Sequence, residues 1–399
     1  MRKSRPERWR YFHAEELVRI LVGHSRYQSG PVSGENRVVD DEVELLRRGG
    51  HDVLLWDPEV ATSSGFGLAK TAQQAVWATE SVDHLRRAMR EHKPDVVHFH
   101  NLFPALSPAV LRAASSAGVP TVMTLHNYRL LCLPATFLRD GKVCEDCLGH
   151  LPWRGIVHRC FRDSLPGSAA YAASLSLHRG IKSFERVSLY LCVSRFVSDK
   201  HVEAGWPRER LEVKPNFTWP SPRRQGPGEY FLFLGRLSSE KGAEVIVDTW
   251  RPELGRLVIA GDGPEMSLLK AKARTGVEFL GAVPPERATT LLSGARAVLV
   301  PSVCYEGAPR TIAEAYGAGV PVIASRIGAL TEAVEAGVTG LLANPGDTAD
   351  WAQAISRLRN DEESVRLGEG GYGLWSKRNS PESSLALLEA AYNRVSSLG

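Results

Sequence analysis

The sequence predicts an α/β protein with two doubly wound domains. Its 399 residues exceed what one ordinary core accommodates and suit two domains of roughly 150–200 residues each. Short apolar runs alternate with helical patterns, which is typical of parallel sheets with crossover helices. A segment at 215–228 with four prolines and two glycines interrupts this alternation and indicates an interdomain linker.

The first half of the chain opens with a βαβ pattern. A helix is expected at 35–48, and Gly49-Gly50 ends it. The apolar side of this helix consists of Val38, Val39, Val43, Leu45 and Leu46. The expected strands are 17–22, 51–56, 96–100, 121–125 and 189–193. An insertion at about 127–168, rich in Pro, Gly and Cys, separates the last two strands, and loops of this length in a compact domain are usually functional.

The second half repeats this alternation without repeating the sequence. Strands are expected at 230–234, 256–260, 277–280, 297–300 and 321–324, and an amphipathic helix at 381–395. We therefore predict an N-terminal domain at 1–217, a second domain at 218–380, and a C-terminal helix at 381–399 that packs back on the first domain. In such proteins a ligand occupies the cleft between the domains, beyond the carboxyl ends of the strands.

Composition excludes several classes of protein. A hydrophobic content of 43% and a charged content of 24% are those of a globular enzyme. A net charge of +4 is lower than expected for a nucleic-acid binder. The sequence contains no apolar run of about 18 residues, and no apolar run follows its basic start, so we expect neither a membrane-spanning helix nor a signal peptide. We expect a cytoplasmic protein. The basic start, Met1 to Arg10, is either a solvated terminus or an arm that contacts anionic lipid at the inner face of the membrane.

Four of the six cysteines lie in the insertion. Cys144 and Cys147 form a C-x2-C knuckle, which Cys132 precedes and Cys160 follows. Four thiolates around such a knuckle suit a structural zinc ion, although the outer spacing is not that of a standard finger. Reduced, unligated thiols and a redox pair are the alternatives. Such a zinc would hold the insertion in place over the cleft between the domains.

The segment from 301 to 315 carries most of the chemical information. It follows a buried strand and opens a helix, with Pro309 at the first turn. The amides of Arg310 and Thr311 would then be free at the helix N-terminus, where they favour an anion. Glu306 and Glu314 are eight residues apart, or about 12 Å along one helix. That separation is too large for a paired-carboxylate glycosidase, which needs roughly 5–9.5 Å. Two separate tasks are more consistent with it, although two solvated glutamates would give the same spacing.

Two cations follow the first strand of the second domain. Arg236 and Lys241, five residues apart, would both point at one site. Cations and helix-end amides stabilise a departing diphosphate.

These motifs together resemble family 4 of the retaining glycosyltransferases. The segment Glu306–Glu314 resembles the E-x7-E signature of that family, and 233–242 resembles its G-R-L-x-x-x-K-G segment. Two further strands, at 257–264 and 277–281, also resemble family strands. The first domain matches more weakly, at 49–53, 94–98 and 124–126. The resemblance implies the GT-B fold, in which two Rossmann-like domains face each other across a cleft. It also implies that the first domain (1–217) binds the acceptor and that the second (218–380) binds the nucleotide-sugar.

The resemblance also implies roles for individual residues. Arg236 and Lys241 would hold the diphosphate, Glu314 the ribose hydroxyls and Glu306 the donor sugar. His126 would lie near the transferred sugar and support its developing positive charge, although a lone histidine after a strand is also often structural. Further donor-binding positions are Gly263, Gly307, Arg310 and Thr311, and the glycine loop is Gly30 and Gly34. Here Gly30 and Gly34 are not adjacent, and Ala308 and Pro309 replace an aromatic residue and a glycine of the family pattern.

We expect a retaining, metal-independent hexosyltransferase that needs no cofactor for catalysis. The chain has no Asp-x-Asp motif, so Arg236 and Lys241 would do what a divalent ion does elsewhere. The donor would be a UDP-sugar or GDP-mannose, and the acceptor a glycan, a lipid-linked glycan or a small molecule, with polysaccharide biosynthesis as the general role. The alternatives are an epimerase or hydrolase of the same fold, a phosphorylase, and a non-catalytic nucleotide-sugar binder.

Overall fold

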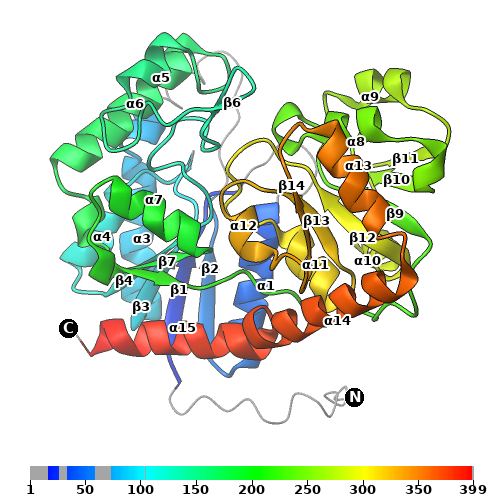
Figure 1. The fold of residues 1–399 in the computed structure, drawn as a ribbon. Coiled ribbons are helices and arrows are strands. Elements are labelled where there is room, and N and C mark those ends of the chain that lie inside the picture. Colours follow the sequence, from blue (N-terminus) through cyan, green and yellow to red (C-terminus); the bar gives the residue numbers. More distant parts are fainter. Residues whose placement is uncertain (1–16, 27–33, 59–72, 104, 398–399) are drawn as a thin grey trace.

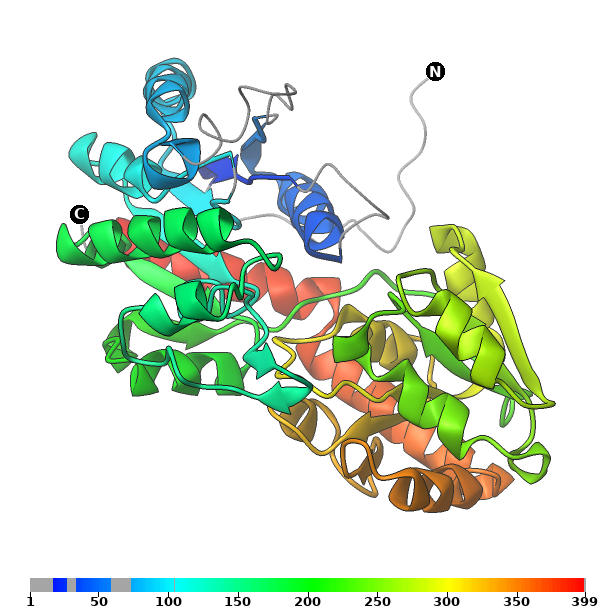
Figure 2. The same cartoon turned by 90° about the horizontal axis from the view of Figure 1, so that it is seen from above.

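The computed structural model describes residues 17–26, 34–58, 73–103 and 105–397. Two six-stranded sheets, each with helices packed on both faces, form two lobes that face each other (Figures 1 and 2). All strand pairs within these two sheets are parallel. The expected α/β class and the pair of Rossmann-like domains are therefore confirmed.

The first sheet has the strand order β2-β1-β3-β4-β7-β8. These strands are β1 (Arg19–Gly23), β2 (Asp52–Trp56), β3 (Val96–Phe99), β4 (Thr121–Leu125), β7 (Leu189–Cys192) and β8 (Leu211–Val213). The helices of this lobe are α1 (Gly34–Arg48), α3 (Thr79–His92), α4 (Ala109–Ser116), α5 (Trp153–Val157), α6 (Leu165–Gly180) and α7 (Arg195–Glu203), with 3-10 turns η2 (Phe184–Arg186) and η3 (Arg208–Arg210).

The second sheet has the order β11-β10-β9-β12-β13-β14. Its strands are β9 (Tyr230–Leu234), β10 (Leu257–Ala260), β11 (Val277–Gly281), β12 (Ala295–Val300), β13 (Val322–Ser325) and β14 (Gly340–Ala343). Its helices are α8 (Ala243–Thr249), α9 (Met266–Lys272), α10 (Pro285–Gly294), α11 (Arg310–Gly317), α12 (Leu330–Ala333), α13 (Thr348–Arg357) and α14 (Asp361–Arg378), with 3-10 turns η4 (Ser239–Lys241) and η5 (Pro252–Leu254).

The last helix, α15 (Pro381–Ser396), leaves the second lobe and packs beneath the first (Figure 1). Its buried side chains Leu385, Leu388 and Tyr392 join a core cluster with Ile20 of β1 and Val39 of α1. Because the strands are covered on both faces, they read as continuous apolar runs rather than as alternating patterns. Domain boundaries at 217 and 380 remain our proposal, and this arrangement of the two sheets supports it.

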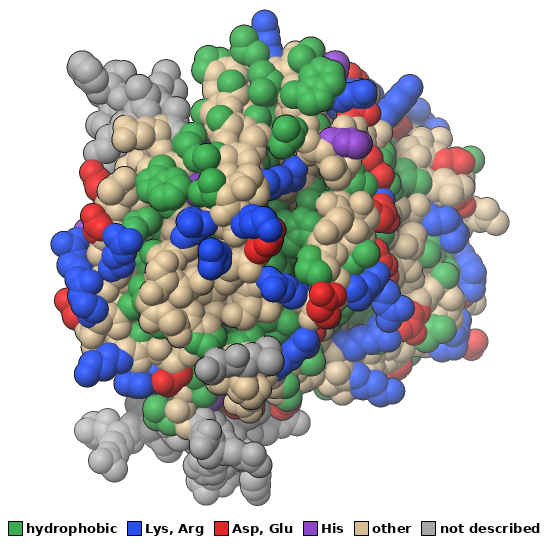
Figure 3. Space-filling view, turned by 90° about the vertical axis from the view of Figure 1, so that its left-hand side faces the viewer, with side chains coloured by type: hydrophobic (Ala, Val, Ile, Leu, Met, Phe, Trp, Pro, Cys, Tyr) green, Lys and Arg blue, Asp and Glu red, His purple; other side chains and the backbone are tan. Residues whose placement is uncertain are grey.

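The cysteine-rich insertion is more ordered than a loop. It holds an antiparallel hairpin of β5 (Leu138–Arg139) and β6 (Lys142–Val143), then α5 and the start of α6. Its surface exposes Leu151, Trp153 and Val157, each more than half accessible. Figure 3 shows apolar side chains gathered at the top of this face, where α5 and α6 lie. In the described part of the chain, no helix combines the length and the apolar character needed to cross a membrane.

Candidate active site

Three loops of the second domain meet at the carboxyl ends of β9, β10 and β12. A side chain at Gly261 would place its Cβ 1.8 Å from the carbonyl oxygen of Gly235, and one at Gly263 would lie 2.2 Å from that of Leu237. Gly242, in the left-handed region at φ 64°, would clash at 2.1 Å with the carbonyl oxygen of Pro301. Glycine is therefore required for these backbones to approach each other. Gly263, predicted as a donor-binding residue, has this packing role in the structure.

Lys241 and Glu306 form an ion pair at the centre of this cluster. Lys241 Nζ lies 2.7 Å from Glu306 Oε1, and the Ser302 hydroxyl donates to the same oxygen at 2.6 Å. Burial by itself would raise the pKa of Glu306, but the Lys241 ammonium outweighs burial and holds that pKa below its usual range. Glu306 is therefore an anion that can accept hydrogen bonds from a sugar hydroxyl.

Arg236 differs from Lys241 in being unpaired. Its side chain is exposed, and no ion pair or hydrogen bond engages it within the described residues. Of the two cations that the sequence pattern directs at one site, Lys241 has a partner in the described structure and Arg236 has none. Lys241 neutralises Glu306, whereas Arg236 remains available to an anionic ligand.

Helix α11 begins directly after Pro309, which lies at its N-cap. The first two amides of the helix, those of Arg310 and Thr311, donate to no group among the described residues, as the sequence predicted. The Arg310 guanidinium is engaged twice. Its Nη1 lies 2.5 Å from Asp41 Oδ2 of α1, and its Nε donates to Glu314 Oε1 at 2.8 Å. The helix end therefore offers two amides to an anion, while the Arg310 side chain joins Glu314 to the other domain.

The first domain contributes His126, which directly follows β4. A Cβ on Gly307 would lie 2.4 Å from the carbonyl oxygen of His126, so the two backbones touch across the interface. Beside this contact, the Tyr128 hydroxyl donates to the carbonyl of Glu306 at 3.0 Å. The structure thus brings His126 next to Glu306 and Gly307, which come from the other domain.

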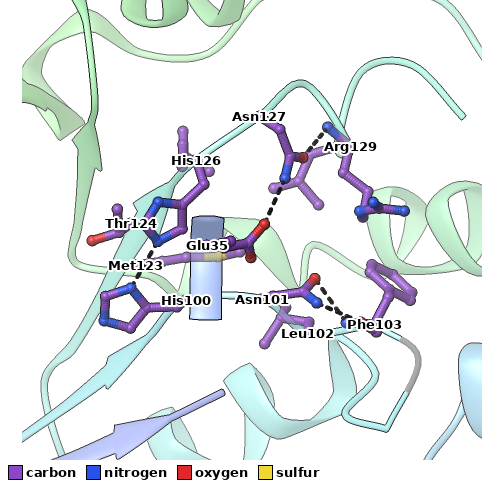
Figure 4. Close-up of a pocket in the computed structure, with 12 residues that line it drawn as sticks. Glu35, His100, Asn101, Leu102, Phe103, Met123, Thr124, His126, Asn127 and Arg129 are labelled. Carbon is purple, nitrogen blue, oxygen red and sulfur yellow. Dashed lines mark hydrogen bonds between the residues drawn. The ribbon is translucent and has the colours of Figure 1, made fainter. Parts of the chain in front are cut away.

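A small pocket lies behind His126 at the carboxyl ends of the first sheet (Figure 4). Glu35, Asn127 and Arg129 share its lining with His126 and His100. Asn127 Nδ2 donates to Glu35 Oε2 at 3.1 Å. Burial raises the pKa of Glu35 to about 7, even though Arg129 and Asn127 both favour the carboxylate. The pocket therefore presents a carboxyl group that can hold or release a proton near neutral pH.

Of the remaining predicted residues, the structure describes Gly34 and the four clustered cysteines. Gly34 is the first residue of α1, and Gly30 falls outside the described residues, as does the basic start of the chain. The four clustered cysteines line one small cavity in the insertion. They do not, however, form a compact ligand set. Among the described residues, only Glu42, His98 and His100 bring three metal-ligating atoms within 4.8 Å of one another.

Sequence reasoning missed several residues that build the site. Asp41, Tyr128 and Ser302 position Arg310 and Glu306, and they carry no motif of their own. Glu42 left a signal, because it lies three and four residues from Val39, Val38, Leu45 and Leu46, on the apolar side of its helix. A carboxylate in that position is buried, and buried carboxylates need a partner.

Comparison with known proteins decides the family. The model for "Glycosyltransferase Family 4" matches residues 32–218, and the model for "Glycosyl transferases group 1" matches residues 228–361. The glycogen synthase of Mycobacterium tuberculosis is 35% identical over 385 residues, which cover 86% of each chain. This chain belongs to family 4 of the glycosyltransferases.

Other relatives of this glycosyltransferase carry different names. The D-inositol 3-phosphate glycosyltransferase of Pseudarthrobacter chlorophenolicus is 28% identical, and the match covers 71% of this chain and 66% of that protein. The GDP-mannose-dependent alpha-mannosyltransferase of Corynebacterium glutamicum is 26% identical, with coverages of 81% and 76%.

Solved structures confirm the GT-B fold of the glycosyltransferase. HepE of Anabaena, in complex with UDP and glucose, superposes with a TM-score of 0.63 at 18% identity and covers 94% of this chain and 99% of that chain. The sucrose-phosphate synthase of Thermosynechococcus elongatus gives a TM-score of 0.68 at 17% identity, with coverages of 96% and 100%.

Proposed function

We propose that this glycosyltransferase transfers a sugar from a UDP-sugar or GDP-mannose to a glycan, lipid-linked or small-molecule acceptor, with retention of the anomeric configuration. The contact between His126 and Gly307 is the observation that carries this proposal. It places a histidine of the first domain beside the Glu306–Lys241 pair of the second. A donor sugar between them would contact the His126 imidazole of the first domain on one side and the Glu306 carboxylate of the second on the other.

The donor phosphates would bind at the N-terminus of α11. The two free amides there and the unpaired Arg236 all favour negative charge. Glu314 would bind the ribose hydroxyls while its other contact, to Arg310, keeps it in place. Glu306 would accept a hydrogen bond from the donor sugar, with its charge balanced by Lys241. Each of these roles is a proposal that the geometry supports.

In the proposed reaction the acceptor attacks on the face from which the nucleotide leaves. The bond between the anomeric carbon and the phosphate oxygen breaks, and positive charge develops on the sugar ring. The departing phosphate oxygen takes the proton from the acceptor hydroxyl as the new glycosidic bond forms. Arg236 and the α11 amides stabilise the charge that accumulates on the diphosphate. This step requires no protein nucleophile, and Arg236 with these amides replaces a divalent ion.

A transfer assay with a panel of donors tests this proposal. UDP-glucose, UDP-galactose and GDP-mannose would be incubated with inositol phosphate, maltooligosaccharides and lipid extracts, with and without a chelator. We expect one donor to give a product whose anomeric coupling constant in NMR matches that of the donor, at the same rate with chelator. An inverted product would overturn retention, and loss of activity with chelator would overturn metal independence. Free sugar without any acceptor would identify a hydrolase or epimerase.

We also propose that the four insertion cysteines bind a structural zinc ion. The small cavity that all four cysteines line supports this. Binding would require the sulfurs to draw closer than in the structure. Elemental analysis of purified protein should find one equivalent of zinc that is lost in Cys144→Ser but retained in Cys192→Ser. Folded, metal-free wild-type protein would contradict it.

A further inference from the structure

Behind His126 runs a chain of buried polar groups that none of the proposed steps uses. It begins at Glu42 of α1, which is 1% exposed and forms an ion pair with the Nζ of Lys214, itself 2% exposed. The Lys214 ammonium opposes the effect of burial and keeps the pKa of Glu42 well below its usual range. The Glu42 carboxylate is therefore ionised and can only accept hydrogen bonds.

The second oxygen of Glu42 faces two histidines of the β3 segment. Glu42 Oε1 lies 3.4 Å from His98 Nδ1 and 3.4 Å from His100 Nε2. This set resembles a metal site in its spacing, but two observations exclude one. The Lys214 ammonium already supplies a cation to Glu42, and both ring nitrogens of His98 are hydrogen-bonded at 2.8 Å, to Tyr392 and Thr124.

His100 connects this carboxylate to His126. Its Nδ1 lies 2.8 Å from His126 Nε2 (Figure 4). The ring centroids are 5.1 Å apart with 19° between the ring planes, as expected for two imidazoles joined edge to edge by a linear hydrogen bond. One of these two nitrogens must carry the proton, and the other must accept it.

The carboxylate decides which nitrogen carries that proton. Glu42 Oε1 and His100 Nε2 are both buried and face each other at 3.4 Å, and neither forms a hydrogen bond to any described residue. If His100 Nε2 lacked a proton, two lone pairs would face each other in a buried place. The proton therefore lies on Nε2. Lys214 already balances the charge of Glu42, so a second buried cation at His100 would be uncompensated. His100 is thus neutral, and its Nδ1 accepts from His126 Nε2–H.

We propose that Glu42 and His100 are positioning residues that fix His126 as the tautomer protonated on Nε2. The lone pair of His126 Nδ1 is then left for a substrate hydroxyl, because no described residue bonds to that atom and His126 lines the pocket. The substrate in this statement rests on the proposed function, whereas the tautomer can be measured without any substrate.

Replacing Glu42 by glutamine should reverse the direction of the hydrogen bonds from residue 42 through His100 to His126. Lys214 would select the amide oxygen, so the amide NH₂ would face His100 Nε2 and donate to it. His100 Nδ1 would then carry the proton and donate to His126 Nε2, and His126 would become protonated on Nδ1. Because Glu42→Gln leaves Lys214 without its carboxylate, the thermal midpoint of this variant is measured beside that of wild type to verify that it folds.

Nitrogen-15 NMR of histidine-labelled protein reads out these tautomers directly. The His126 signals are assigned from their absence in His126→Gln. We expect His126 protonated on Nε2 in wild type and on Nδ1 in Glu42→Gln. The matched control is Glu389→Gln. Glu389 Oε1 lies 3.2 Å from Nε2 of another buried histidine, His51, and neither residue belongs to the Glu42–His100–His126 series. The control should leave the His126 signals unchanged.

Transfer activity provides the second readout. Wherever the tautomer reverses, kcat/KM should fall about 10- to 100-fold, because an N–H would meet the hydroxyl that a lone pair had bound. Glu389→Gln should retain wild-type kcat/KM. Wild-type His126 protonated on Nδ1, a doubly protonated His100, or the wild-type His126 tautomer in folded Glu42→Gln would each overturn the proposal. If the tautomer reverses but no sugar transfer is found in wild type, the positioning holds and the proposed function fails.

Discussion

Arg310 of α11 and Asp41 of α1 join the two domains through an ion pair of 2.5 Å. The Arg310 side chain is 12% exposed, and its Nε also donates to Glu314. The Arg310 guanidinium therefore holds Glu314, the carboxylate that we propose binds the ribose hydroxyls, and connects it to the first domain. The donor site and the interdomain contact share a residue, so disturbing either should affect the other.

Asp41→Asn should weaken the domain interface. The substitution removes one of two anions from a mostly buried guanidinium, and we expect a loss of about 1–3 kcal/mol, seen as a lower thermal midpoint. Asp199→Asn is the control, since its pair with Arg208 is exposed and should contribute about 0–1 kcal/mol. Equal midpoints for the two variants would show that the pair does not hold the domains.

Glu306→Gln should separate sugar binding from nucleotide binding. The neutral amide would bind a sugar hydroxyl more weakly, and we expect kcat/KM to fall about 10- to 100-fold. Affinity for the free nucleoside diphosphate, measured by calorimetry, should change little, because Arg236 and the α11 amides remain. Equal losses for nucleotide and nucleotide-sugar would contradict the role given to Glu306.

Gly261→Ala should destabilise the second domain severely. A Cβ there would lie 1.8 Å from the carbonyl oxygen of Gly235, at a φ of 151°. Overpacking against a backbone atom costs about 3 kcal/mol or more. Gly373→Ala is a matched control within α14, where a Cβ meets nothing within 4 Å, and it should stabilise by about 0.5–1 kcal/mol. Denaturation with urea would compare the two, and a stable Gly261→Ala variant would refute the packing account.

Glu35 should make stability fall as pH rises towards 7. Its pKa is about 7 in the folded protein, above its ordinary value of 4.5. Between these values the folded state binds the proton more tightly, so stability falls as pH rises through this window and stays lower above it. Glu35→Gln removes the effect. Its thermal midpoint relative to wild type should therefore increase from pH 5 to pH 8, and a constant or decreasing difference would contradict the pKa.

The sequence predicted the fold best where burial dominates. The apolar runs that became β4 and β9 were placed at their observed bounds, because strands covered on both faces have no polar positions to confuse the pattern. The strands β8 and β14 were missed. They have three and four residues, and their pairing depends on neighbours distant in the sequence. The hairpin and helix of the insertion were missed because turn-rich sequence masked them.

The site was predictable from the second domain more than from the first. Glu306, Glu314 and Lys241 lie in motifs whose local spacing survives folding. Asp41 and His100 act only through tertiary contacts with Arg310 and His126, which no local pattern reveals. Lys241 also shows that a motif does not reveal which group its residues contact, since the lysine expected to hold the diphosphate is bonded to Glu306.

We propose that Arg236 and Glu314 of the second domain bind the nucleotide-sugar. Isothermal calorimetry with UDP, GDP, ADP and their common sugar conjugates measures this binding on wild type, Arg236→Ala and Glu314→Ala, with Arg208→Ala as a surface control. We expect that one nucleotide binds wild type and the control, and that its affinity is about tenfold or more lower in both site variants. Absence of binding to any nucleotide, or full affinity in both site variants, would contradict it.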